Sequence, residues 1–143
     1  MQSEALAATE AECAKGKTAP RVSLADLEDN IVSEFYFTAA QAVNATMRDG
    51  TLLADDNRTL VPDSFGVLTI CLLAVRNGFT IVGKSAPADA ANFDPALGRK
   101  LAYEDAVRQL WPLMGYALRE KLHDCWYHRC LADRYGAHRL RAE

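Results

Sequence analysis

The Asn77-Gly78 pair constrains the fold most, because it lies between two apolar runs rich in β-branched side chains. The runs cover residues 67–75 (VLTICLLAV) and 80–84 (TIVGK). In the two-residue type I′ turn that often joins such runs, both central residues have positive φ, which asparagine and glycine tolerate. The sequence therefore predicts an antiparallel β-hairpin that turns on Asn77-Gly78.

Helical patterns lie on both sides of this hairpin. Ser23 precedes apolar residues at helical spacing, which predicts a helix over about 24–45 whose apolar surface is broader than one core face requires. After the hairpin, Asp94-Pro95 predicts a helix start, because aspartate caps free N–H groups and proline suits the first helical position. We expect Pro112 to interrupt that helix, and a last helix to follow and end near Gly136.

These patterns together predict an α+β protein, with a small antiparallel sheet packed against C-terminal helices and an N-terminal helix. Residues 48–66 are typical of turns around short strand-like pieces at 51–54 and 59–61. We divide the chain into residues 1–45, a leader and helix expected to serve in assembly, and residues 46–143, the sheet and helices expected to bind a ligand. The surplus apolar surface of the N-terminal helix predicts contact with another subunit, and therefore a homo-oligomer.

Composition limits the compartment and the partners. Residues 1–66 hold 11 acidic and 5 basic side chains, and residues 67–143 hold 8 and 11. The acidic first half argues against a general nucleic-acid coat, whereas the basic second half could meet an anion. The chain has no apolar run of about 18 residues, and its acidic, alanine-rich start is unlike a signal peptide. We expect a cytoplasmic protein that contacts no membrane and no nucleic-acid polymer.

Catalytic motifs are missing from the sequence, which contains no nucleophile elbow, phosphate-binding loop or dinucleotide fingerprint. His123, Cys125, His128 and Cys130 invite a zinc interpretation, but on a helix their offsets scatter the side chains around the axis. We therefore expect no catalytic residue, no metal and no cofactor, and we interpret the chain as a binding protein and not an enzyme. The four cysteines form no CxxC pair and are expected to be free thiols.

A candidate anion site surrounds the helix start at Asp94. Arg99 and Tyr103 share one face of that helix, and Asn92-Phe93 lie in the loop before it. A guanidinium, an aromatic ring and an amide could together hold the phosphate and base of a nucleotide. The same spacing also allows Phe93 and Tyr103 to be packing residues and Arg99 to be a surface residue, so both interpretations stay open.

Four segments resemble a family of small tailed-phage proteins that includes the first type of Thoeris anti-defence protein. They are LTICLLAVRNGFTIVGKS at 68–85, NFD at 92–94, GRK at 98–100 and LWPLMGYALR at 110–119. The resemblance implies a phage-encoded protein that binds a cyclic nucleotide immune signal in the host cytosol without cleaving it. The signal would be a glycocyclic ADP-ribose or a cyclic oligonucleotide. One departure is Pro87, which stiffens a loop where family members have a different sequence.

The resemblance also implies roles for particular residues: Phe93 stacks on a base, Asn92 reads polar groups, and Arg119 contacts phosphate. Arg99 and Tyr103 are added from their shared helix face, and Lys84 and Arg76 are outer candidates. The alternative function is a protein-interaction module that directly inhibits a host defence protein. The resemblance allows the homo-oligomer to be a dimer or a hexamer. The sequence leaves open which of the two forms, which nucleotide binds and how many sites there are.

Overall fold

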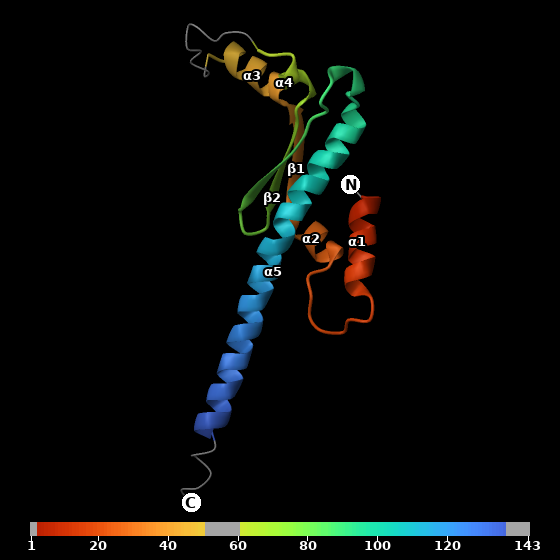
Figure 1. The fold of residues 1–143 in the computed structure, drawn as a ribbon. Coiled ribbons are helices and arrows are strands. Elements are labelled where there is room, and N and C mark those ends of the chain that lie inside the picture. The colour runs from red at the N-terminus through yellow and green to blue at the C-terminus, as the bar shows by residue number, and fades with distance from the viewer. Residues whose placement is uncertain (1–2, 51–60, 137–143) are drawn as a thin grey trace, which may run out of the picture.

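The computed structural model describes residues 3–50 and 61–136, and it shows an α+β protein (Figure 1). The elements in chain order are α1 (Glu4–Ala14), α2 (Leu24–Asn30), β1 (Ile31–Thr38), α3 (Ala39–Arg48), α4 (Ser64–Val67), β2 (Thr69–Val75), β3 (Thr80–Ser85), the 3₁₀ turn η1 (Ala90–Asn92) and α5 (Pro95–Gly136). The strand-like piece at 51–54 and most of the piece at 59–61 lie outside the described residues.

The sheet has three antiparallel strands in the order β1-β2-β3. Residues that pair directly across it include Phe35 with Leu72 and Leu72 with Val82. Because paired residues point to the same face, this row lies on the face opposite the buried residues Cys71 and Leu73. The expected antiparallel sheet is confirmed, and β2 is its central strand.

The hairpin is confirmed, but the predicted type I′ turn is wrong. Gly78 has φ +83°, whereas no non-glycine residue in the described part of the chain has positive φ, so Asn77 does not. The Gly78 N–H donates to the Val75 carbonyl at 2.8 Å, and the Val75 N–H donates to the Phe79 carbonyl at 3.0 Å. This pattern fits a three-residue loop in which a glycine in the left-handed region follows the tight turn. Asn77 instead accepts a hydrogen bond from the Phe79 N–H through Oδ1, at 3.0 Å.

The predicted helix over 24–45 is also wrong, because it divides into α2, β1 and α3. The start at Ser23 is correct: Ser23 and Asp26 form a reciprocal capping box. After about two turns, however, the chain leaves the helix, and Ile31–Thr38 forms a strand that pairs with β2. The segment IVSEFYFT consists largely of β-branched and aromatic residues, which suit a pleated strand. The broad apolar surface expected of the helix therefore belongs to a strand that contributes to the sheet.

The C-terminal region is one helix of 42 residues, so the predicted interruption at Pro112 is wrong. Proline removes one helical hydrogen bond, the one to the carbonyl of Arg108. Arg108 and Pro112 are both exposed, so water can reach the carbonyl that loses its partner. The predicted start is confirmed, since Asp94 Oδ1 accepts hydrogen bonds from the N–H groups of Ala96 and Leu97 at 2.8 and 3.3 Å.

The core lies between α5 and one face of β2 and β3. Cys71, Leu73, Val75 and Ile81 of the sheet are buried against a helix stripe. That stripe comprises Ala102, Tyr103, Ala106, Val107 and Leu110. The small alanines let the helix approach the sheet closely, and this is where Gly83 meets Ala102 and Ala106. Within the described ranges, no helix has the length and hydropathy needed to cross a membrane.

The N-terminal helix α1 packs beside this core (Figure 1). Leu6 is 2% exposed and joins the core cluster. The hydroxyl of Ser3 donates to the buried carboxylate of Glu104 on α5. The same carboxylate contacts Arg108 at 3.4 Å. Burial of a carboxylate is unfavourable unless the group is paired. These contacts therefore stabilise the buried Glu104 carboxylate, and the Ser3 hydrogen bond links the N-terminal segment to α5.

Candidate functional site

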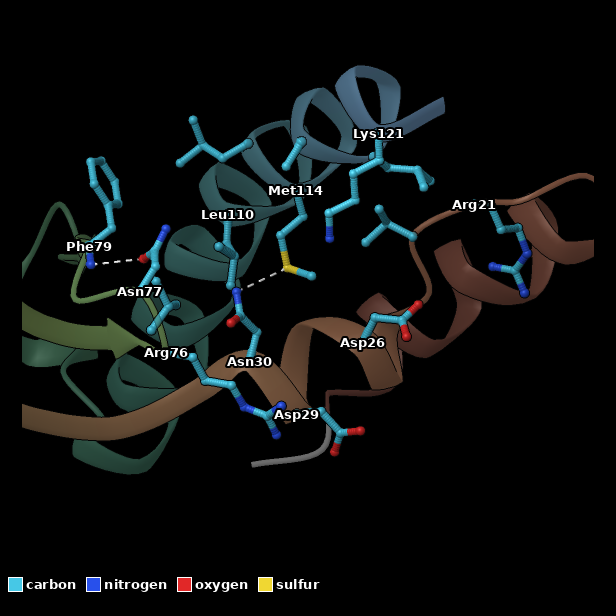
Figure 2. Close-up of a pocket in the computed structure, with 15 residues that line it drawn as sticks. Arg21, Asp26, Asp29, Asn30, Arg76, Asn77, Phe79, Leu110, Met114 and Lys121 are labelled. Atoms are coloured by element: carbon cyan, nitrogen blue, oxygen red, sulfur yellow. Dashed lines mark hydrogen bonds between the residues drawn. The ribbon is translucent and has the colours of Figure 1, made fainter. Parts of the chain in front are cut away.

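A cavity of about 660 Å³, here called the hairpin pocket, lies where α2, the β2–β3 turn and the middle of α5 meet (Figure 2). Its size falls within the roughly 300–1,000 Å³ typical of small-molecule sites. The residues that carry chemistry are Asp26, Asp29 and Asn30 from α2, Arg76, Asn77 and Phe79 from the turn, and Lys121 from α5, with Arg21 at the edge. Leu110 and Met114 supply apolar wall.

A backbone hydrogen bond holds the turn against α2. The Arg76 N–H donates to the Asn30 carbonyl at 3.0 Å, which places the end of β2 next to the end of α2. The side-chain amide of Asn30 also contacts Met114 Sδ at 3.4 Å, so α2 is linked to α5 across the pocket (Figure 2). Phe79 follows the turn and is 54% exposed, which leaves much of its ring free to contact a ligand.

Some of the charged side chains that line the pocket already have partners within the protein. Arg21 forms an ion pair with Glu10 of α1, and its guanidinium is turned away from Lys121 (Figure 2). Asp26 accepts hydrogen bonds from the hydroxyl and the N–H of Ser23, at 2.6 and 2.8 Å. The hydroxyl hydrogen bond is the main reason that the pKa of Asp26 is lowered from its ordinary value of 3.8. Both charged groups therefore already have partners within the protein.

Lys121, Arg76 and Asp29 make no ion pair with any described residue. The Lys121 ammonium points into the pocket, whereas Arg76 and Asp29 extend on the side of α2 below it (Figure 2). Cations of this kind bind phosphate oxygens, and a carboxylate can accept hydrogen bonds from ribose hydroxyls. Phe79 adds a ring on which a base can stack. The hairpin pocket can thus provide one group for each part of a nucleotide.

Only one predicted site residue, Arg76, lines the hairpin pocket. Phe93 and Arg99 do lie together, in a smaller cavity of about 300 Å³ beside Thr69 at the other end of β2. Since β2 runs from Thr69 to Val75, the two cavities are separated by roughly 20 Å of strand. The predicted residues therefore do not line a single cavity of the chain.

The other predicted site residues lie outside both cavities. Asn92 is exposed at the end of η1, and Arg119 is exposed on α5. Lys84 is exposed on β3, where its N–H donates to Asp105 at 3.0 Å. Tyr103 is 2% exposed in the core, and burial raises its pKa to about 12. A ring buried to this degree offers a ligand little surface.

Sequence reasoning missed Phe79, Asp29 and Lys121 as candidates. Phe79 directly follows the turn, so its place on the hairpin was readable from the sequence. Lys121 follows Leu110 and Met114 at helical spacing, which would have placed it on the same side of α5. The expected break at Pro112 separated these residues in the prediction, whereas the continuous helix aligns them.

The model of the Phage protein (N4 Gp49/phage Sf6 gene 66) family matches residues 22–122. The match covers more than two thirds of the chain, from the start of α2 through the sheet and along α5, and the chain belongs to this phage protein family. The predicted membership of a phage family is thereby confirmed. No significant match was found among curated proteins or among solved structures.

Proposed function

We propose that this phage protein binds a cyclic nucleotide immune signal of the ADP-ribose or cyclic oligonucleotide class and sequesters it. The observation that supports this proposal is that Lys121, Arg76, Asp29 and Phe79 all line the hairpin pocket. Two cations suit a pyrophosphate, the carboxylate suits ribose hydroxyls, and the ring suits a base. The resemblance to the Thoeris anti-defence proteins suggests the ligand class, and membership of the phage family is consistent with it.

We propose further that the ligand is held and not cleaved, so that the protein is not an enzyme. Among the residues that the structure describes, those that line the hairpin pocket include no histidine, cysteine, serine or threonine. The wall therefore lacks a pairing of nucleophile and imidazole base of the kind that activates covalent catalysis. Charge and stacking stabilise a bound nucleotide without any change in its covalent bonds.

Calorimetry with glycocyclic ADP-ribose tests the binding, and heat denaturation followed by mass spectrometry tests the fate of the ligand. We expect saturable binding and recovery of the intact ligand. Recovery of a hydrolysed product would contradict sequestration, and no binding of this signal or of cyclic oligonucleotides would contradict the function as a whole.

Two matched pairs of variants locate the site. Lys121→Ala and Phe79→Ala should each weaken binding at least about tenfold, or roughly 1.4 kcal/mol. Arg119→Ala and Phe93→Ala remove the same kinds of side chain outside the hairpin pocket and should change affinity little. If Arg119→Ala and Phe93→Ala weakened binding and the other two variants did not, the ligand would bind at the residues that the family resemblance implies.

Direct inhibition of a host defence protein is the second candidate function. The exposed acids Glu4, Glu12 and Glu34 on the N-terminal part of the chain favour it, because they would suit a basic protein surface. Isolation of a stoichiometric complex with one host defence protein, with no small molecule bound, would support this candidate over the first.

A further inference from the structure

The ion pair between Arg21 and Glu10 joins the edge of the hairpin pocket to α1. The Arg21 side chain lines the pocket, and its guanidinium pairs with the Glu10 carboxylate. The other carboxylate oxygen of Glu10 accepts a hydrogen bond at 3.2 Å from the N–H of Leu24, the first residue of α2. Glu10 and Arg21 both precede residue 22, where the match to the phage family begins. The contact therefore lies in a part of the chain that the family match does not cover.

The backbone beside Arg21 is held in place, whereas its side chain is free to turn. The Val22 carbonyl accepts a hydrogen bond from the indole N–H of Trp111 on α5 at 3.3 Å, and the capping box of α2 begins at Ser23. The side chains of Arg21 and Glu10 are 34% and 19% exposed. An ion pair that solvent reaches contributes little to stability. Another anion can therefore replace Glu10 at the guanidinium without disturbing the backbone.

The charges around the pocket favour such an exchange. Among the described residues that line it are three cations and two carboxylates, which are Arg21, Arg76, Lys121, Asp26 and Asp29. Glu10 adds a third carboxylate at the edge, so positive and negative groups are equal in number while Arg21 is paired. When Arg21 leaves Glu10 and turns to the pocket, the lining has positive charge in excess, which attracts an anion.

We propose that Arg21 is a phosphate-binding residue of the hairpin pocket, and that Glu10 holds it while no phosphate is bound. This inference rests on the proposed function, because it concerns a phosphate-bearing ligand in the same pocket. The phosphate replaces Glu10 at the guanidinium, whose planar N–H groups bind phosphate oxygens in pairs. Glu10 thereby lowers the affinity for every ligand that uses Arg21. The site then favours ligands with at least two phosphate groups, which reach Arg21 as well as Lys121.

Titration calorimetry of the full chain with inorganic pyrophosphate tests the exchange without the nucleotide. Glu10→Gln should bind pyrophosphate about threefold more tightly than the wild type, because Arg21 is released from an exposed ion pair. The glutamine retains an oxygen for the Leu24 N–H. Arg21→Gln should bind pyrophosphate about fivefold more weakly, because a charge-assisted contact is lost. An unchanged affinity in either variant would overturn the proposal.

The double variant separates a direct effect from a general change of charge. In the Arg21→Gln background, Glu10→Gln should leave the affinity unchanged within about twofold, because no guanidinium remains to be released. Equal tightening with and without Arg21 would overturn the proposal. Asp63→Asn is a second control: Asp63 is exposed and makes no side-chain cap hydrogen bond to α4. Its loss removes the same charge, and the affinity should change by less than about twofold.

Two further outcomes separate this inference from its alternatives. If the ion pair serves only to attach α1, urea unfolding will show that Glu10→Gln and Arg21→Gln are equally destabilised, while both bind pyrophosphate as the wild type does. That result would overturn the proposal, as would the absence of pyrophosphate binding by Glu10→Gln at about 10 mM. If pyrophosphate binds in the expected pattern but glycocyclic ADP-ribose does not bind, the proposed function fails and the phosphate site at Arg21 stands.

Discussion

Gly83 of β3 lies directly against Ala102 of α5. A β-carbon at position 83 would come within 2.0 Å of the Ala102 carbonyl oxygen and 2.8 Å of the Ala106 Cβ. These atoms belong to the helix backbone and to a side chain with no rotamer freedom, so neither can move aside cheaply. The absence of a side chain at Gly83 therefore allows α5 to approach the sheet this closely.

Gly83→Ala should destabilise the protein by about 3 kcal/mol or more, since overpacking of a tight contact commonly costs 1–3 kcal/mol and this contact involves backbone. Urea denaturation followed by circular dichroism measures the loss. Gly66→Ala is the control, because a β-carbon there meets no atom within 4 Å, and its stability should change by less than about 1 kcal/mol. Equal effects of the two variants would contradict the close contact.

The turn glycine provides a second test. Gly78 has φ +83°, a region that costs an L-residue about 1–2 kcal/mol. Gly78→Ala should lose stability of this size, and Gly78→Asn should lose less, because asparagine tolerates this region. Thermal unfolding of the two variants compares them. A larger loss for Gly78→Asn would indicate that backbone conformation is not what selects glycine here.

Thiol reactivity tests the core. Cys71 is fully buried, whereas Cys13, Cys125 and Cys130 are exposed. A chromogenic disulfide reagent at pH 8 should therefore modify three cysteines rapidly in the folded protein and the fourth only on unfolding. Fast modification of all four would place Cys71 at the surface.

Alkaline pH should weaken the same core. Burial raises the pKa of the Cys71 thiol from 9.0 to about 11. A raised pKa means that the folded state holds the proton more tightly, so this stabilisation is complete below pH 9 and is lost as pH rises towards 11. Cys71→Val should reduce the loss of stability between pH 9 and 10. An unchanged slope would assign the alkaline effect to other groups, such as Tyr103.

The capping box of α2 predicts an acid-dependent effect. Ser23→Ala should cost about 1 kcal/mol and should return the pKa of Asp26 towards 3.8, because the Ser23 hydroxyl is the main cause of its lowering. A lowered pKa stabilises the fold above pH 3.8, and this contribution is lost as pH falls. NMR titration of Asp26 measures the shift. Thr38→Ala removes the equivalent cap of α3, whose partner Gln41 does not titrate, so it should leave Asp26 unchanged.

Local signals predicted the parts of the fold that depend on local chemistry. The hairpin and the start of α5 could be predicted because Asn77-Gly78 and Asp94-Pro95 determine the backbone conformation of the few residues around them. The strand β1 could not be predicted in this way, because the apolar residues of 31–38 also fit helical spacing. They form a strand because they pair with β2, which is distant in the sequence. The site could be predicted only in part. Arg76 was predicted, but Lys121 lines the same pocket only because α5 continues through Pro112.

The continuity of α5 has a mechanical consequence. Because α5 is one continuous helix, it carries both the core stripe and a wall of the hairpin pocket, and the rotational position of each is fixed relative to the other. One residue inserted after Pro112 would turn everything beyond it by about 100°. The core before the insertion would keep its contacts, while Lys121 would leave the pocket.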